Sequence, residues 1–249
     1  MIKFFIPKLI ACIGDSLTMD GDNARHAITV LRLNVNDKII VCDGDGTDYL
    51  CEIIKTGRES VNLTVLSSEP SKSEPHATVY LFASLLKGDK TDLVIQKSVE
   101  IGVSSIYLMV TENCVVKSIT VDKLARLNKI AEAAAKQSGR GVIPTVHLAG
   151  NLNNVLFATT KNTKTANLHD FILLAGHEKN DSSLKKILGN YTQIQKAAIF
   201  IGPEGGFSPA EIALLEKNNA TLFSLGKRVL RAETAAIAAL AAIFYEVEG

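Results

Sequence analysis

The sequence predicts an α/β fold that follows a small β-rich domain, and three observations support this. Residues 37–67 contain strand-length apolar runs separated by GDG and TGRE turns. From residue 77 onward, such runs alternate with helical segments, which is typical of βαβ units and a parallel sheet. Between these patterns lies SSEPSKSEPH, residues 67–76, which is rich in Ser and Pro and lacks apolar periodicity. We therefore expect one domain over residues 1–72 and another over residues 73–249.

The first domain is expected to be a small antiparallel barrel. MIKFFIP at the start of the chain supplies a short strand, and residues 23–33 form a short helix. DKIIVCD, DYLCEIIK and SVNLTVLS supply the remaining strands.

The second domain begins with a βαβ unit. TVYLFASLL is a buried type of strand, residues 89–102 form a helix that ends at a glycine, and SSIYLMV is the next strand. A long helix over residues 122–138 and a strand over residues 171–175 follow.

A glycine-rich loop is the strongest local feature of the chain. The apolar run KAAIFI, residues 196–201, precedes GPEGGF, residues 202–207. Ser208, Pro209 and Glu211 then provide a helix start, with an N-cap, a proline in the first turn and a capping box. The loop thus lies at the carboxyl end of a strand, where open α/β sheets bind their ligands.

A second strand and helix complete the chain. ATLFSL, residues 220–225, precedes a loop with Lys227, Arg228 and Arg231, and then ten consecutive apolar residues, 235–244. This alanine-rich run predicts a helix, far shorter than the roughly 20 residues that cross a bilayer. A helix that is apolar nearly all round must be buried, and we expect a second subunit to cover it.

Composition excludes several protein classes. The 249 residues carry a net charge of +1, with 8 Lys/Arg and 11 Asp/Glu in residues 1–75, so charge alone does not indicate nucleic acid. The N-terminus lacks the pattern of a signal peptide. The four cysteines, Cys12, Cys42, Cys51 and Cys114, show no CxxC spacing. We expect reduced thiols in a cytoplasmic protein, no metal site and no membrane association.

Two motifs together identify a resemblance. GPEGGFSPAEI, residues 202–212, and LGKRVLRAETAAIAAL, residues 225–240, resemble the RsmE family of ribosomal RNA methyltransferases, which belong to the SPOUT class. The resemblance implies a PUA-like barrel followed by a SPOUT domain with a parallel sheet and a deep trefoil knot. It also implies a homodimer that uses S-adenosylmethionine to methylate N3 of a uridine in small-subunit (16S) ribosomal RNA.

The resemblance places the cofactor among the C-terminal loops. Loop backbone groups would hold the adenine and ribose, and apolar side chains would line the adenine slot. The implied cofactor residues are Leu174, Gly176, Ile201, Gly202, Glu204, Gly205, Gly206, Leu225, Gly226, Leu230, Thr234 and Ala235.

Catalysis is assigned to Arg231 and Glu233. N3 of uridine carries a proton at neutral pH, so a base or a cation that stabilises the uracil anion must help. Arg231 and Glu233 lie beside the cofactor loop and supply both. Glu233 can also be explained as a helix N-terminal charge.

Candidate RNA contacts are cations spread along the chain. The resemblance and their loop positions indicate Lys3, His26, Arg32, Lys87, Lys90 and Arg140. Ordinary explanations remain open: a helix cap for His26, a solvated helix face for the lysines and a helix end with a surface arginine for Arg140. This chain departs from the usual family sequence at three positions: Lys3 and Asn113 stand where the family usually has Arg, and Lys136 stands where it usually has Glu.

Other functions stay open at this point. The chain could be a SPOUT methyltransferase acting on another RNA such as transfer RNA, or a non-catalytic RNA-binding ribosome assembly factor. It could also be a nucleotide-phosphate enzyme with GPEGG as an anion nest, although the Lys-Ser/Thr of a P-loop is missing.

Overall fold

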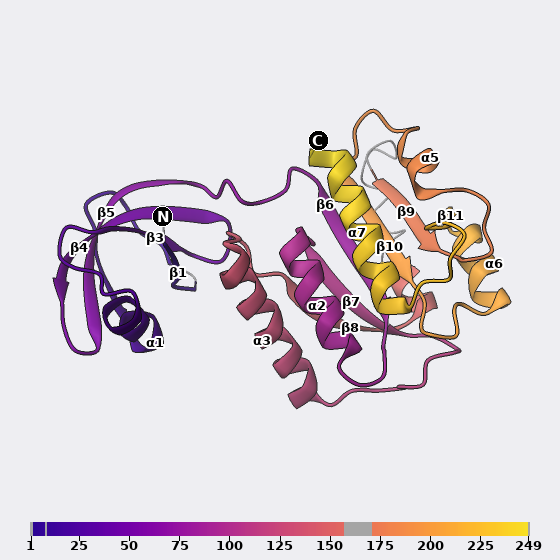
Figure 1. The fold of residues 1–249 in the computed structure, drawn as a ribbon, viewed down its shortest axis with the longest axis horizontal. Coiled ribbons are helices and arrows are strands. Elements are labelled where there is room, and N and C mark those ends of the chain that lie inside the picture. Colours follow the sequence, from indigo (N-terminus) through magenta and orange to yellow (C-terminus); the bar gives the residue numbers. More distant parts are fainter. Residues whose placement is uncertain (1, 8, 157–170, 249) are drawn as a thin grey trace. The chain divides into compact units, whose positions relative to one another are not determined.

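The computed structural model describes residues 2–7, 9–156 and 171–248. The chain divides into two compact units (Figure 1). Unit 1 contains residues Met1–Glu74 and Ala135–Ile143, and unit 2 contains Pro75–Ala134 and Pro144–Gly249.

Unit 1 is built on a five-stranded curled sheet with the order β1-β3-β4-β5-β2. Its strands are β1 (Lys3–Phe5), β2 (Ser16–Asp20), β3 (Lys38–Cys42), β4 (Thr47–Thr56) and β5 (Ser60–Pro70). β1 pairs with β3 in parallel, whereas the other pairs are antiparallel, so the sheet departs from the expected all-antiparallel barrel.

The expected helix of unit 1 has two parts. α1 (Gly21–Arg25) continues directly into the π-helical turn His26–Val30. Ala24 and Ala27 are fully buried against a core of Met19, Ile39 and other strand residues. The small alanine side chains let this segment approach the sheet closely.

Unit 2 contains a six-stranded, fully parallel sheet with the order β11-β9-β10-β6-β7-β8. The strands are β6 (Thr78–Ser84), β7 (Ser105–Val110), β8 (Thr145–Asn151), β9 (Phe171–Gly176), β10 (Lys196–Ile201) and β11 (Thr221–Phe223). The chain builds β6, β7 and β8 outward in one direction and places β9, β10 and β11 on the other side of β6. This reversal is a topological switch point, where ligands of parallel sheets bind.

Both faces of this sheet are covered. Phe82 and Phe200 are buried in a core that includes Leu215, and their strand neighbours Leu81 and Ile199, which face the opposite side, are also fully buried. The helices are α2 (Lys90–Ile101), α3 (Val121–Ser138), α5 (Leu184–Leu188), α6 (Pro209–Lys217) and α7 (Ala232–Glu248). Figure 1 shows α2 and α7 in front of the strands.

The apolar face of the C-terminal helix α7 is buried by other elements of the same chain, whereas we expected a second subunit to cover it. Leu240, Ile243 and Phe244 are buried within the single chain, where α7 contacts α2 and β10. The Phe244 ring lies 3.2 Å from where a Cβ on Gly102 would stand. The expectation that a second subunit covers these residues is therefore wrong, because α2 of the same chain already does so.

The trefoil knot stays a prediction. No helix in the described part of the chain is both long enough and apolar enough to span a bilayer.

Candidate active site

A cavity of about 210 Å³ opens at the carboxyl ends of β9, β10 and β11, which are neighbours in the sheet. Three chain segments supply its walls: residues 176–178, residues 201–206 and residues 223–235. Most residues of these strands are buried, and the three loops extend from their carboxyl ends.

The loop after β10 has its conformation set at both ends. At its end, Ser208 Oγ accepts the Glu211 N–H and Glu211 Oε2 accepts the Ser208 N–H, which completes the predicted capping box. Within the loop, Gly206 has φ +69°, a backbone conformation that side chains with a Cβ rarely adopt. A Cβ on Gly202 would lie 3.1 Å from Phe207 N, so a side chain there would press against the backbone of the loop.

Most predicted cofactor residues line this one cavity. They are Gly176, Ile201, Gly202, Glu204, Gly205, Gly206, Leu225, Gly226, Leu230 and Ala235. Leu174 is fully buried inside β9 and Thr234 is exposed on α7, and neither lines the cavity.

Further residues line the cavity that the sequence did not indicate as cofactor contacts. They are His177, Glu178, Pro203, Phe223, Ser224, Arg228, Val229 and Ala232. Pro203, Arg228, Val229 and Ala232 lie within the two motif segments, and Phe223 and Ser224 directly precede the second, so their positions beside predicted residues were the available signal. His177 Nδ1 lies 3.9 Å from Glu178 Oε2, and no motif marked this pair.

A charged cluster lies next to the glycine-rich loop. Lys90 Nζ at the start of α2 donates to Glu204 Oε1 at 2.9 Å and lies 3.9 Å from Glu233 Oε2. Burial would raise the pKa of Glu204, but the hydrogen bond from Lys90 and those from backbone N–H groups outweigh it and lower the pKa. Lys90, predicted as an RNA contact, is thus engaged with cofactor-loop carboxylates.

Glu233 is the buried acid of this cluster. The residue is 9% exposed, and its Oε2 accepts no hydrogen bond from any described residue. It lies in the first turn of α7, where the helix dipole favours a negative charge. A buried carboxylate oxygen without a donor is costly, so such an atom in a site favours a functional explanation.

Arg231 is placed differently from Glu233. Its side chain is exposed and does not line the cavity, while its carbonyl accepts the Ala235 N–H at 2.8 Å at the start of α7. The arginine of this loop that does line the cavity is Arg228.

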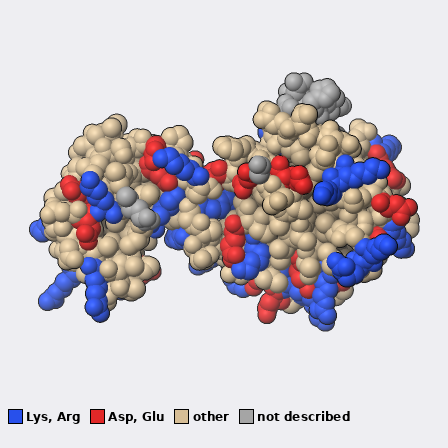
Figure 2. All heavy atoms as spheres, turned by 45° about the horizontal axis from the view of Figure 1, so that its top comes forward, with Lys and Arg blue, Asp and Glu red and all other residues tan. Residues whose placement is uncertain are grey.

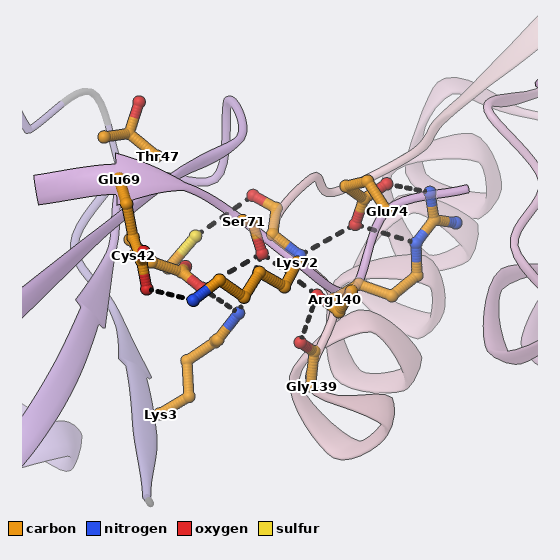
Figure 3. A network of polar contacts seen from close by, with 12 residues as sticks. Lys3, Cys42, Thr47, Glu69, Ser71, Lys72, Glu74, Gly139 and Arg140 are labelled. Carbon is orange, nitrogen blue, oxygen red and sulfur yellow. Dashed lines mark hydrogen bonds and ion pairs between the residues drawn. The ribbon is translucent and has the colours of Figure 1, made fainter. Parts of the chain in front are cut away.

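In unit 1, the candidate RNA contact Lys3 is engaged by protein groups. Its Nζ lies 2.8 Å from Asp48 Oδ2 and donates to Ser71 Oγ at 3.1 Å (Figure 3). Both charged side chains are only 12% exposed. The buried Cys42 thiol donates to Gly141 O nearby, and burial raises its pKa to about 11.

Arg140 is also buried rather than presented on a surface loop. Its guanidinium donates two hydrogen bonds to the Glu74 carboxylate, at 2.6 and 3.3 Å, and its side chain is 4% exposed (Figure 3). Glu74 Oε1 also accepts the N–H groups of Gly141 and Val142. Burial would raise the pKa of Glu74, but Arg140 and these amides lower it. The expected exposed arginine is thus replaced by a buried ion pair that holds the loop after α3.

The remaining candidate RNA contacts are exposed. His26 meets Phe4 edge-on, with ring centroids 6.2 Å apart, and Arg32 has a left-handed φ of 53°. Lys87 is exposed in the loop before α2. On the visible face of each unit, Figure 2 shows basic and acidic side chains interspersed, in keeping with the net charge of +1.

Comparison with known proteins assigns the family. A family profile described as an RNA methyltransferase domain matches residues 72–244, and one described as an RNA methyltransferase PUA domain matches residues 19–66. Ribosomal RNA small subunit methyltransferase E of Bacillus subtilis is 30% identical, over 100% of this chain and 98% of the relative. The protein of that name from Rickettsia conorii is 32% identical, over 91% of this chain and 88% of the relative.

A solved structure gives the same result. Ribosomal RNA small subunit methyltransferase E from Neisseria gonorrhoeae, bound to S-adenosyl methionine, superimposes with a TM-score of 0.79 at 27% identity. The match covers 99% of this chain and 98% of that chain. This chain belongs to the RNA methyltransferase family, with the PUA and methyltransferase domains of the small-subunit methyltransferase E proteins.

Proposed function

We propose that this protein transfers a methyl group from S-adenosylmethionine to N3 of a specific uridine in small-subunit (16S) ribosomal RNA. The observation that carries the proposal is the cavity at the carboxyl ends of β9, β10 and β11, lined by both halves of the family motif. The full-length similarity to small-subunit methyltransferase E proteins supports the substrate.

The cavity suits an adenosine-containing cofactor with a positive charge. Its walls combine apolar side chains such as Ile201 and Leu230 with the backbone of the glycine-rich loop, which approaches a ligand closely because Gly202 and Gly206 lack a Cβ. The carboxylates of Glu178 and Glu204 also line it and complement a cation. S-adenosylmethionine supplies an activated methyl group, so the protein mainly positions the nucleophile in line with it.

Proton removal from N3 is assigned to the charged groups beside the cavity. We propose Glu233 as the base, because its buried Oε2 is free of hydrogen-bond donors among the described residues. The Lys90 ammonium lies 3.9 Å from this oxygen. Arg231 is exposed and can approach the uracil ring or its phosphate, where a guanidinium stabilises negative charge.

RNA binding is divided between two proposed domains, residues 1–72 and 73–249. The exposed Lys87, His26 and Arg32 are the direct contacts in this proposal. The other three candidates form ion pairs with carboxylates of the protein, so in this proposal they affect RNA binding only indirectly; they are Lys3, Lys90 and Arg140. We further propose a cytoplasmic location and a trefoil knot in the second domain, both on the family resemblance.

A homodimer is also part of the proposal, through a different face of α7 from the buried one. Ala241 is exposed and Tyr245 is 79% exposed on the same side of the helix, four residues apart. Tyr245→Glu should shift the protein to monomers in sedimentation. The matched change at another exposed apolar position, Val121→Glu, should leave a dimer.

The function is tested by mapping base methylation in ribosomal RNA from cells with and without this protein. N3-methyluridine at one 16S position should disappear in cells that lack the protein, and the purified protein should restore it on isolated small subunits. Loss of a methyl group from transfer RNA instead would favour the other RNA substrate. Unchanged methylation with defective subunit assembly would favour the assembly factor.

A further inference from the structure

The loop after β7 contacts the glycine-rich loop through Asn113. Asn113 Nδ2 donates to Gly205 O at 3.2 Å and to Gly206 O at 3.1 Å. A Cβ on Gly205 would lie 3.1 Å from the Asn113 Cβ, so the two loops are also in close van der Waals contact. Gly205 and Gly206 both line the cavity, although Asn113 itself does not.

These two hydrogen bonds act on the residue of the loop that has a left-handed conformation, Gly206. The carbonyls of Gly205 and Gly206 belong to the peptide groups on either side of the Gly206 Cα. One carboxamide therefore holds both peptide planes that define the left-handed conformation of Gly206, φ +69°. Glycine leaves this conformation easily, so an external contact is needed to keep a single loop shape.

The loop that carries Asn113 is itself held by hydrogen bonds. Lys117 Nζ donates to the carbonyls of Thr111 and Glu112, at 3.3 and 2.7 Å. The Glu112 N–H donates to Glu211 Oε1 at 2.8 Å, while the other oxygen of Glu211 forms the α6 capping box. The Glu211 carboxylate thus ties the loop of Asn113 to the end of the glycine-rich loop.

We propose that Asn113 is a positioning residue for the cofactor, which holds the glycine-rich loop in its binding shape through the carbonyls of Gly205 and Gly206. This inference rests on the proposed function, because it takes the cavity as the S-adenosylmethionine site. The role requires a donor with two N–H groups, and it explains how a short amide serves at a position where the family resemblance leads one to expect arginine.

The decisive variant is Asn113→Asp, which keeps the shape and replaces two donors with acceptors that face two carbonyl oxygens. S-adenosylmethionine affinity, measured by calorimetry at pH 7.5, should fall about tenfold or more, the scale of losing two hydrogen bonds and adding repulsion. Lowering the pH toward the ordinary range of an Asp should restore part of it relative to the parent protein, because a protonated Asp donates one hydrogen bond. Asn190→Asp, at an exposed site beyond α5, is the matched control and should bind as the parent does.

Two further measurements separate positioning from general damage. Hydrogen exchange of the Gly206 amide, which donates to Pro203 O, should be faster in Asn113→Asp and in Asn113→Ala, while the unfolding midpoint stays within a few degrees. Turnover at saturating cofactor should fall much less than affinity does.

The proposed function and this inference can fail separately. Gly206→Val serves as the reference change in the cavity. If Gly206→Val abolishes binding and Asn113→Asp binds as tightly as the parent with unchanged Gly206 exchange, the positioning role is refuted and the cavity stands. If both variants bind as the parent does, the cofactor lies elsewhere and both assignments are refuted.

Discussion

Two regions of this molecule hold charged residues at positions marked by the family resemblance, and they use them differently. Around Glu74 in unit 1, Lys3 and Arg140 are almost fully buried and paired with carboxylates. Beside the cavity in unit 2, Glu233 Oε2 is buried without a donor among the described residues, and Arg231 is exposed. The first set forms ion pairs within the protein, although Asp48 Oδ1 in it also lacks a hydrogen-bond partner among the described residues. The second set is the one that the proposed function assigns to the substrate.

The comparison shows why a charged residue in a motif does not define a role. An arginine whose donors are used by a buried carboxylate has little left to offer to a phosphate. A carboxylate that lacks a donor is energetically costly, and this cost is typical of functional sites.

The largest expected effect is on stability, from the ion pair in unit 1. Arg140→Ala leaves the partly buried Glu74 carboxylate without its cation, so the free energy of unfolding should fall by about 3 kcal/mol, the lower end for a buried pair. Urea unfolding followed by circular dichroism measures this. If Arg140→Ala is as stable as the parent protein but binds RNA more weakly, Arg140 would instead be assigned to the RNA-binding surface.

The next effect is on turnover, from the exposed arginine beside the cavity. Arg231→Ala should lower kcat by about 10², the scale of losing one electrostatic stabiliser, with little change in cofactor affinity. Arg231→Lys should recover only part, because a point charge lacks the two-pronged donor. Lys227→Ala removes a charge from the same exposed loop and is the control. Full activity in Arg231→Ala would leave Arg228, which lines the cavity, as the next candidate.

A smaller effect distinguishes two lysines close in sequence. Lys87 is exposed, so Lys87→Ala should make the salt dependence of RNA binding shallower by about one phosphate contact. Lys90 is paired with Glu204, so Lys90→Ala should mainly weaken cofactor binding. Filter binding at several salt concentrations measures both. Equal slopes in the parent and Lys87→Ala would place the RNA elsewhere.

The smallest effect is on how the free energy of unfolding changes with pH under acidic conditions. The pKa of Glu74 is lowered in the folded state, so its contribution is present above the ordinary pKa of a glutamate and is lost as the pH falls through the folded value. Glu74→Gln should therefore flatten the loss of stability between about pH 5 and pH 3. An identical pH profile in the parent and the variant would contradict this assignment.

Local rules predicted much of the cofactor loop and little of its surroundings. The spacing of Ser208 and Glu211 alone predicts a helix start, and the structure contains the predicted capping box. The partner of Arg140 could not be found this way, because Glu74 lies 66 positions earlier in the chain. Such pairs depend on how distant segments fold together.

The same limit explains the C-terminal helix and the missed cavity residues. The apolar run of α7 correctly predicts burial, but nothing in it says whether α2 or a second subunit covers Leu240. His177 and Glu178 join the cavity only because β9 lies between β10 and β11 in the sheet. Strand order is a property of the whole fold.

The central claim is that the cavity beside the glycine-rich loop holds S-adenosylmethionine, and one calorimetric comparison tests it most directly. Valine cannot easily adopt φ +69°, so Gly206→Val should distort the loop and remove measurable binding. Gly14→Val is the control, since Gly14 also has a positive φ, +92°, but lies in unit 1 and outside the cavity. Loss of binding in Gly206→Val alone is the predicted result, and parent-like affinity in a folded Gly206→Val protein would contradict the claim.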